Sequence, residues 1–275
     1  MRAAHPNALA TLAAASAAAA LATAAASAAP AETIDVGQFP AAVYEDVIIP
    51  VPSEIFAVLD KLGSPDWDSM LPAEFPGVGQ QRERIALRLG NVIADGFIAV
   101  QAGSPEVVKD IGREVLKLAG AIGVRDAVIA RSRRITDAAD EQNWTKVRRE
   151  LDGAMQDVKQ AMVELHDEEL AQLVSLGGWL RGTQALTAAV DADYRAETAE
   201  LLHQPALLEY FARRIGGMPA AIRDHELVAE IRAQLERIRP LIDVGDGRGI
   251  QPDSVREIHA MTSGLVTAIA APPEA

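Results

Sequence analysis

Apolar residues along most of the chain recur at intervals of three and four positions, the spacing that places them on one face of an α-helix. Between Pro105 and Pro205 there is no proline, and helix is the regular structure that fits so long a tract. The expected fold is therefore all-α, an antiparallel bundle of about eight to ten helices. The pattern predicts helices over residues 80–102, 105–120, 125–139, 143–165, 168–189, 192–203, 206–215, 220–242 and 252–270.

A short sequence pattern occurs twice in the chain, each time beginning at a tryptophan. Trp144 and Trp179 are each followed by leucine at the seventh position and by alanine at the tenth. Their separation is close to the ~34-residue period of tetratricopeptide-type helical repeats. No third copy of the pattern occurs at positions 109 or 214. Two similarly packed helices in one bundle therefore explain the repeated pattern equally well.

The first 28 residues have the order of a secretory signal peptide. Arg2 precedes an uncharged run rich in alanine and leucine, and small residues follow before Pro30. Cleavage is expected after Ala28, with cleavage after Ala31 as the alternative. An uncleaved membrane anchor is a further interpretation, but an alanine run is weakly hydrophobic beside a spanning helix of ~20 strongly apolar residues. We therefore expect export, to the periplasm or the exterior, and removal of residues 1–28.

Residues 29–79 are expected to precede the main domain. Four prolines between positions 30 and 52 favour extended backbone, which predicts an irregular arm. A short helix is expected over 53–62, with Ser53 as its N-cap. Glycines and prolines then predict a loop over 63–79. The helical bundle domain is assigned to residues 80–275.

Composition narrows the classes of function. The chain has 26 basic and 39 acidic residues, a net charge of −13, and loss of Arg2 with the signal peptide would make it −14. Nucleic acid is a poor partner for such a chain, because phosphate binding needs a basic surface. The absence of cysteine excludes disulfides, thiolate metal sites and cysteine nucleophiles. After signal cleavage no stretch of the sequence is apolar enough to form a transmembrane segment.

The stretch GGWLRGTQ, residues 177–184, places an arginine in a helix with almost no polar face. Glycine in a helix interior costs ~1 kcal/mol relative to alanine, so the three glycines indicate that another element approaches closely. A buried Arg181 must be paired. A salt bridge to an acid on a neighbouring helix is the favoured interpretation, and a kink that leaves Arg181 in water is another.

A ligand pocket is the third interpretation of Arg181. Arg181 would bind a carboxylate or phosphate with two parallel hydrogen bonds, Gln184 would add amide hydrogen bonds, and Trp179 would form an apolar wall. Asp95, which lies upstream on the expected helix at 80–102, is the fourth candidate residue for this pocket. It could instead be the salt-bridge partner of Arg181.

A stripe of polar residues lies on the expected helix at 80–102. Arg84, Arg88, Asn91 and Asp95 step by four, three and four positions, which places them on one helical face. Because an amphipathic helix normally turns such a face to water, we interpret the stripe as solvent-exposed.

Residues 125–149 carry seven basic and four acidic side chains, a local excess of positive charge in an acidic protein. Such a segment could bind an anionic lipid, a glycan or an acidic protein. Neutralisation by acidic helices of the same chain is the favoured alternative. The candidate surface residues are Arg131, Arg133, Arg134, Lys146, Arg148 and Arg149.

Signals for metal binding and catalysis are sparse. Glu200 and His203 form one Glu-x-x-His pair, whereas di-iron bundles use two such pairs and two further glutamates. The motifs Gly-x-Ser-x-Gly, Ser-x-x-Lys and His-Glu-x-x-His do not occur. No catalytic residue and no cofactor is predicted, and an enzyme is the least favoured class of function.

Two functions remain as hypotheses. The favoured one is a non-catalytic interaction or scaffold module that binds a protein or an anionic component of the cell envelope. The alternative is a small-molecule binding protein with a pocket around Arg181. The first requires an exposed patch, and the second requires an enclosed Arg181 that no acid of the chain neutralises.

Overall fold

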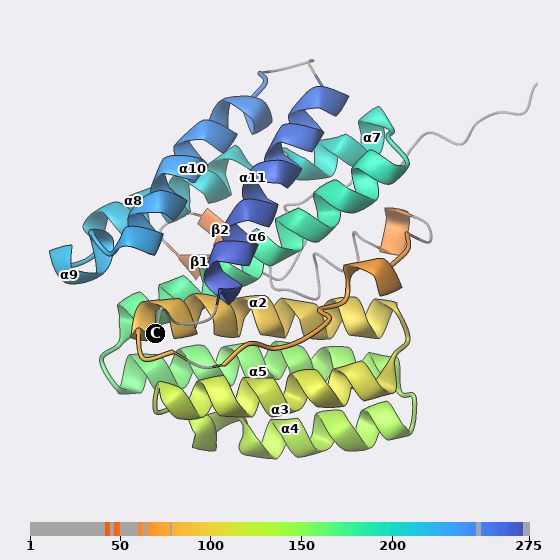
Figure 1. Cartoon of the computed structure of the whole chain (residues 1–275), viewed down its shortest axis with the longest axis vertical. Coiled ribbons are helices and arrows are strands. Elements are labelled where there is room, and N and C mark those ends of the chain that lie inside the picture. Colours follow the sequence, from red (N-terminus) through yellow and green to blue (C-terminus); the bar gives the residue numbers. More distant parts are fainter. Residues whose placement is uncertain are drawn as a thin grey trace, which may run out of the picture. The chain divides into compact units, whose positions relative to one another are not determined.

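The computed structural model describes residues 42–44, 47–49, 60–62, 65–77, 79–245 and 249–271. The chain divides into two compact units, Met1–Gln38 and Phe39–Ala275, and the described residues belong to the second. Helices dominate this unit, which confirms the all-α multi-helix prediction (Figure 1). The α-helices are α2 (Arg82–Gln101), α3 (Pro105–Ala121), α4 (Arg125–Asp140), α5 (Trp144–Glu164), α6 (Glu168–Ala192), α7 (Ala196–Ala199), α8 (Pro205–Gly217), α9 (Ala220–Arg223), α10 (Glu226–Ile242) and α11 (Pro252–Ala270).

Two predicted helices differ from the structure. The helix expected over 192–203 begins at Ala196, because Asp193 has a non-helical and Arg195 an extended backbone. It ends in the 3-10 turn η4 (Glu200–Leu202). The helix expected over 220–242 is divided into α9 and α10. His225 interrupts it with a polyproline-like backbone (φ −58°, ψ 131°), which a continuous helix cannot contain.

Two short stretches of the arm before the bundle are described, and both are extended, as the prolines of this segment predict. Strands β1 (Ala42–Tyr44) and β2 (Val47–Ile49) pair antiparallel, with Val43 opposite Ile48. The sequence pattern did not predict this pairing. Only the 3-10 turn η2 (Asp60–Leu62) of the helix expected over 53–62 is described. The expected signal peptide, residues 1–28, lies outside the described residues.

The helices form two groups that meet where α2 contacts α6. Helices α2, α3, α4 and α5 lie side by side, each against the next, and α5 returns to α2 (Figure 1). Helix α6 packs on α2, and α11 packs on both of them. Helix α10 packs against both α11 and α8. Among the described helices, none combines the length and the apolar character needed to cross a bilayer.

Glycines bring the backbones of α2 and α6 into direct contact. A Cβ atom on Gly90 would lie 2.0 Å from the Val174 carbonyl oxygen, and one on Gly177 would lie 2.0 Å from that of Leu87. Both distances are far below any permitted contact, so only glycine allows the two helices to approach this closely. Helix α2 also packs against α3, α5 and α11, and nearly every residue beyond its first turn is buried.

Replacing these glycines tests the contact. Gly90→Ala and Gly177→Ala should each lower the free energy of unfolding by about 3 kcal/mol or more, because an added methyl group must push two backbones apart. Gly182→Ala is the matched control in the interior of α6. Within the described ranges no atom lies within 4 Å of a Cβ placed there, so this change should raise stability by about 0.5–1 kcal/mol. Urea unfolding at pH 7 measures all three, and wild-type stability of Gly90→Ala would contradict the backbone contact.

Candidate functional site

The arginine of α6 is buried and paired. Arg181 Nε donates to Asp95 Oδ1 at 2.7 Å, and both side chains are 9% exposed. The other guanidinium nitrogens donate to Gln184 Oε1 at 2.9 Å and to the backbone carbonyl of Met70. The structure thus confirms the salt bridge to Asp95. Burial raises the pKa of the Asp95 carboxyl, and the charge and hydrogen bond of Arg181 act against that rise.

The polar stripe on α2 is also buried, so its interpretation as a solvent-exposed face is wrong. Arg88 Nη2 donates to Glu114 Oε1 of α3 at 2.5 Å, and both residues are nearly inaccessible to solvent. Arg84 is half-buried and donates to the carbonyl of Ala268. The reason is tertiary: the segment 65–77, which includes the 3-10 turn η3 (Asp68–Met70), covers this face of α2.

Two arginines hold the covering segment in place through its backbone. Arg88 donates to the carbonyls of Pro76 at 2.6 Å and Gly77 at 2.8 Å. Arg181 donates to the carbonyl of Met70. Charge-assisted hydrogen bonds of this kind are about twice as strong as neutral ones. The segment is therefore held near its middle and at its C-terminal end by arginine side chains of α2 and α6.

A cavity of about 530 Å³ lies beneath this segment, and we call it the loop-covered cavity. Asp95, Arg181 and Gln184 line it, together with Arg88 and Asn91. Its apolar lining is Pro65, Met70, Leu71, Pro72, Phe75, Pro76, Val92, Ala185, Ala188, Ala192, Val266 and Ala270. The structure brings three of the four predicted ligand-binding residues into one cavity.

Trp179 is the predicted residue that the structure places elsewhere. It is not among the described residues that line the loop-covered cavity. Its indole Nε1 donates to Gln204 Oε1 at 3.2 Å, and its ring lies 5.6 Å from that of Phe211. Two residues along a helix correspond to a rotation of about 200°, so Trp179 and Arg181 face opposite sides of α6.

Asn91 is the residue of this cavity that sequence reasoning missed. It is 4% exposed, and within the described part of the chain neither its Nδ2 nor its Oδ1 has a hydrogen-bond partner. Its place in the stripe of α2 was visible in the sequence, but its burial was not. Buried amides are almost always hydrogen-bonded in proteins, so this one requires an explanation.

Helix α11 adds a second polar group to the cavity. His259 lines it, with Nδ1 3.1 Å from Thr187 Oγ1 and Nε2 3.3 Å from Ser263 Oγ. Ser263 in turn accepts from Gln184 Nε2 at 3.1 Å. The Nδ1 atom faces a threonine hydroxyl and the Gln184 carbonyl, where a catalytic triad would have a carboxylate. The hydrogen bond to Ser263 orients the Gln184 amide.

The basic segment is largely neutralised by the chain's own acids. Arg131 donates to Asp157 at 2.7 Å and to Glu150 at 3.1 Å, and Arg134 donates to the same Glu150 at 2.8 Å. This supports the self-neutralised interpretation for α4 and α5. The remaining predicted surface residues are Lys146, which pairs with Glu141, Arg148, which pairs with Asp60, and the exposed Arg133 and Arg149.

The two residues predicted as weak metal ligands, Glu200 and His203, lie next to each other. His203 Nδ1 lies 3.1 Å from Glu200 Oε1. Among the described residues no group of three histidine or acidic side chains is close enough to hold a metal ion.

A comparison of the chain with protein-family models, curated proteins and solved structures found no match. The site is therefore interpreted from its own geometry.

Removing Arg181 should be strongly destabilising. Arg181→Ala leaves the buried Asp95 carboxylate without its partner and releases the Met70 carbonyl, so we expect a loss of about 3–5 kcal/mol in urea unfolding. The double variant Asp95→Leu with Arg181→Met should recover most of that loss, because an apolar pair leaves no unpaired charge. Equal stability of Arg181→Ala and wild type would contradict a paired core charge.

The pairing of Glu150 predicts a loss of stability in acid. Burial raises the pKa of the Glu150 carboxyl, but hydrogen bonds from Arg134 and Arg131 outweigh it and leave the pKa lowered. A lowered folded-state pKa contributes stability above the unfolded value of about 4.3, and this is lost as pH falls through the folded value. Unfolding from pH 6 to pH 3 should therefore show a steeper decline for wild type than for Glu150→Gln. Glu141→Gln, at an exposed pair, should behave like wild type.

Proposed function

We propose that this chain is an exported binding protein that holds a compact polar small molecule in the loop-covered cavity. The observation that carries the proposal is the Asn91 amide, which is buried in the lining without a partner among the described residues. Leaving a buried donor or acceptor unsatisfied costs about 1–3 kcal/mol for each group. A ligand that offers an acceptor beside a donor would satisfy both amide atoms at once.

The charges in the cavity favour a neutral ligand over an anionic one. Asp95 neutralises Arg181, and Glu114 neutralises Arg88, so neither guanidinium offers an unbalanced charge. The exposed acids Asp66 and Glu74 also line the cavity and would repel an anion. The sequence hypothesis that Arg181 binds an anionic ligand required an arginine without an acid, and Asp95 removes that condition. A volume of about 530 Å³ is within the usual range of small-molecule sites. The best match is a carboxamide or a lactam-like heterocycle with a partly apolar body.

Entry to the Asn91 amide requires movement of the covering segment. Both amide atoms are out of contact with solvent in the closed arrangement, and Arg88 and Arg181 hold the segment by its carbonyls. Arg88 and Arg181 thus hold the covering segment in place through these hydrogen bonds. The part of a ligand that reached the Asn91 amide would be shielded from water, which strengthens its hydrogen bonds there.

The interaction-module hypothesis has less support. It depended on the basic segment, and Arg131 and Arg134 there are held by Glu150 and Asp157. Export remains part of the proposal because it rests on the pattern of residues 1–28 alone. Fractionation of the native host, with the mature mass measured, would test export separately from binding.

Native mass spectrometry of protein purified from its own host tests the binding function. Wild type should carry the additional mass of a small organic molecule. Asn91→Leu, which replaces the amide with an apolar side chain of similar size, should lose that mass and remain folded. Thr262→Val is the matched control, since Thr262 is fully buried and is not among the residues that line the cavity. A bare wild-type mass, or the same adduct on Asn91→Leu, would refute the proposal.

A further inference from the structure

The covering segment, residues 65–77, carries acidic side chains and neither lysine nor arginine. Asp66 and Glu74 are exposed and line the loop-covered cavity, whereas Asp68, which is also exposed, is not among its lining residues. Asp66 and Glu74 lie on either side of Met70, where an arginine of α6 holds the segment. Carboxylates from both halves of the covering segment therefore border the cavity.

The charges of Asp66 and Glu74 are not balanced by a partner. Asp66 Oδ1 accepts from the Ser69 backbone N–H at 3.2 Å, and the Ser69 hydroxyl donates to the Asp66 carbonyl at 2.7 Å. These bonds orient the Asp66 carboxylate without neutralising it. No basic side chain that the structure describes pairs with either carboxylate. Exposed carboxylates are normally hydrated, so they indicate a ligand only together with an independent observation.

The buried side of the cavity adds no positive charge that could compensate. Arg88 and Arg181 are each paired with a buried carboxylate. His259 Nδ1 lies 3.3 Å from the Gln184 carbonyl oxygen, which only accepts, so Nδ1 carries a proton. The Ser263 hydroxyl can then donate to Nε2 at 3.3 Å, and the imidazole is satisfied in its neutral form. The net charge of the lining is therefore negative and comes from the covering segment.

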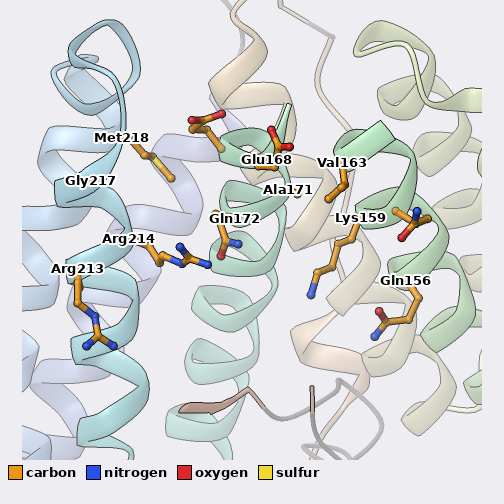
Figure 2. Close-up of a pocket in the computed structure, with 12 residues that line it drawn as sticks. Gln156, Lys159, Val163, Glu168, Ala171, Gln172, Arg213, Arg214, Gly217 and Met218 are labelled. Atoms are coloured by element: carbon orange, nitrogen blue, oxygen red, sulfur yellow. The ribbon is translucent and has the colours of Figure 1, made fainter. Parts of the chain in front are cut away.

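A second cavity of similar size lacks this one-sided charge. A cleft of about 560 Å³ lies between α5, α6 and α8 (Figure 2). Lys159 of α5 and Arg214 of α8 line it together with Glu168 of α6. Because side chains of both signs are present there, that lining does not select the charge of a ligand. The loop-covered cavity does, because its arginines are already neutralised.

Asn91 is the independent observation that a ligand belongs in the loop-covered cavity. It is 4% exposed, it lines the cavity, and both of its amide atoms lack a partner among the described residues. Apolar side chains, among them Met70, Leu71 and Phe75, form much of the remaining wall. Apolar walls concentrate the field of the charges that border a cleft. A ligand thus meets an unsatisfied amide where water is excluded and negative charge on the exposed side.

We propose that the ligand of the loop-covered cavity is a cation, with an amide group that binds Asn91 and an ammonium group that faces the carboxylates of Asp66 and Glu74. This inference rests on the proposed function and adds the charge of the ligand to it. An aminoalkyl carboxamide is the simplest molecule of this class. Since both carboxylates belong to the covering segment, their attraction to the ammonium group would also hold that segment over the bound ligand.

Calorimetric titration of the purified full chain at pH 7 and low salt tests the charge with three probes of equal carbon number. These are 5-aminopentanamide, 5-hydroxypentanamide and glutaramate, which carry an ammonium, a hydroxyl and a carboxylate group opposite the amide. The ammonium probe should bind about fivefold or more tightly than the hydroxyl probe, and the carboxylate probe should bind most weakly. In 1 M sodium chloride, where the screening length is about 3 Å, the preference for the ammonium probe should largely disappear.

Variants of the covering segment locate the effect. Asp66→Asn and Glu74→Gln should each lower the association constant of the ammonium probe by about two- to fivefold and leave that of the hydroxyl probe unchanged. Asp68→Asn is the matched control, because it removes an exposed carboxylate of the same segment that does not line the cavity. It should leave both association constants unchanged. All three positions are exposed, so the variants should melt like wild type.

The outcomes separate this inference from the proposed function. Equal affinity for the ammonium and hydroxyl probes, both lost in Asn91→Leu, would overturn the inference and leave the proposed function standing. The inference also fails if Asp68→Asn weakens the ammonium probe as much as Asp66→Asn does, or if no probe binds wild type saturably. In that last case the adduct on protein from its own host decides the proposed function by itself.

Discussion

The contact between the backbones of α2 and α6 is the constraint on which the rest of the structure depends. Gly90 and Gly177 remove the side chains that would otherwise hold the two helices apart. The same approach brings Asp95 of α2 within hydrogen-bonding distance of Arg181 on α6. A buried charge is tolerable only when it is paired, so the close crossing and the salt bridge support each other. The two groups of helices are joined at this crossing.

The buried polar stripe of α2 determines how the covering segment is held. A chain segment that lacks regular structure has carbonyl groups that need donors, and Arg88 and Arg181 supply them. Each arginine also pairs with a carboxylate, Arg88 with Glu114 and Arg181 with Asp95. The outcome is an anchored cover over a cavity in which Asn91 alone is left unsatisfied among the described side-chain groups of that lining.

The guanidinium groups of the loop-covered cavity are structural, because buried acids balance them and they donate to backbone carbonyls of the covering segment. The cavity therefore favours a neutral, hydrogen-bonding ligand over an anionic one. The exposed carboxylates of Asp66 and Glu74 in its lining add to this preference.

Local patterns determined the helices. Apolar spacing and the long interval without proline located α2 to α6 and α11 to within a few residues, since helical periodicity is a property of adjacent turns. The glycines around Arg181 also indicated a close helix contact, and the choice of Asp95 as partner followed from the small number of polar residues on apolar helices. The exceptions arose where backbone geometry departs from the pattern, as at His225 and between Ala192 and Ala196.

Tertiary structure alone decided which polar residues are buried and which share a cavity. The stripe of Arg88 and Asn91 has the spacing of a solvent-exposed face, and only the covering segment 65–77 makes it interior. Trp179 and Arg181 are neighbours in sequence but face opposite sides of α6. Lys159 and Arg214 lie 55 positions apart, and they face one cleft because α5 and α8 both border α6. Burial and convergence depend on contacts between distant segments, which periodicity along one helix does not encode.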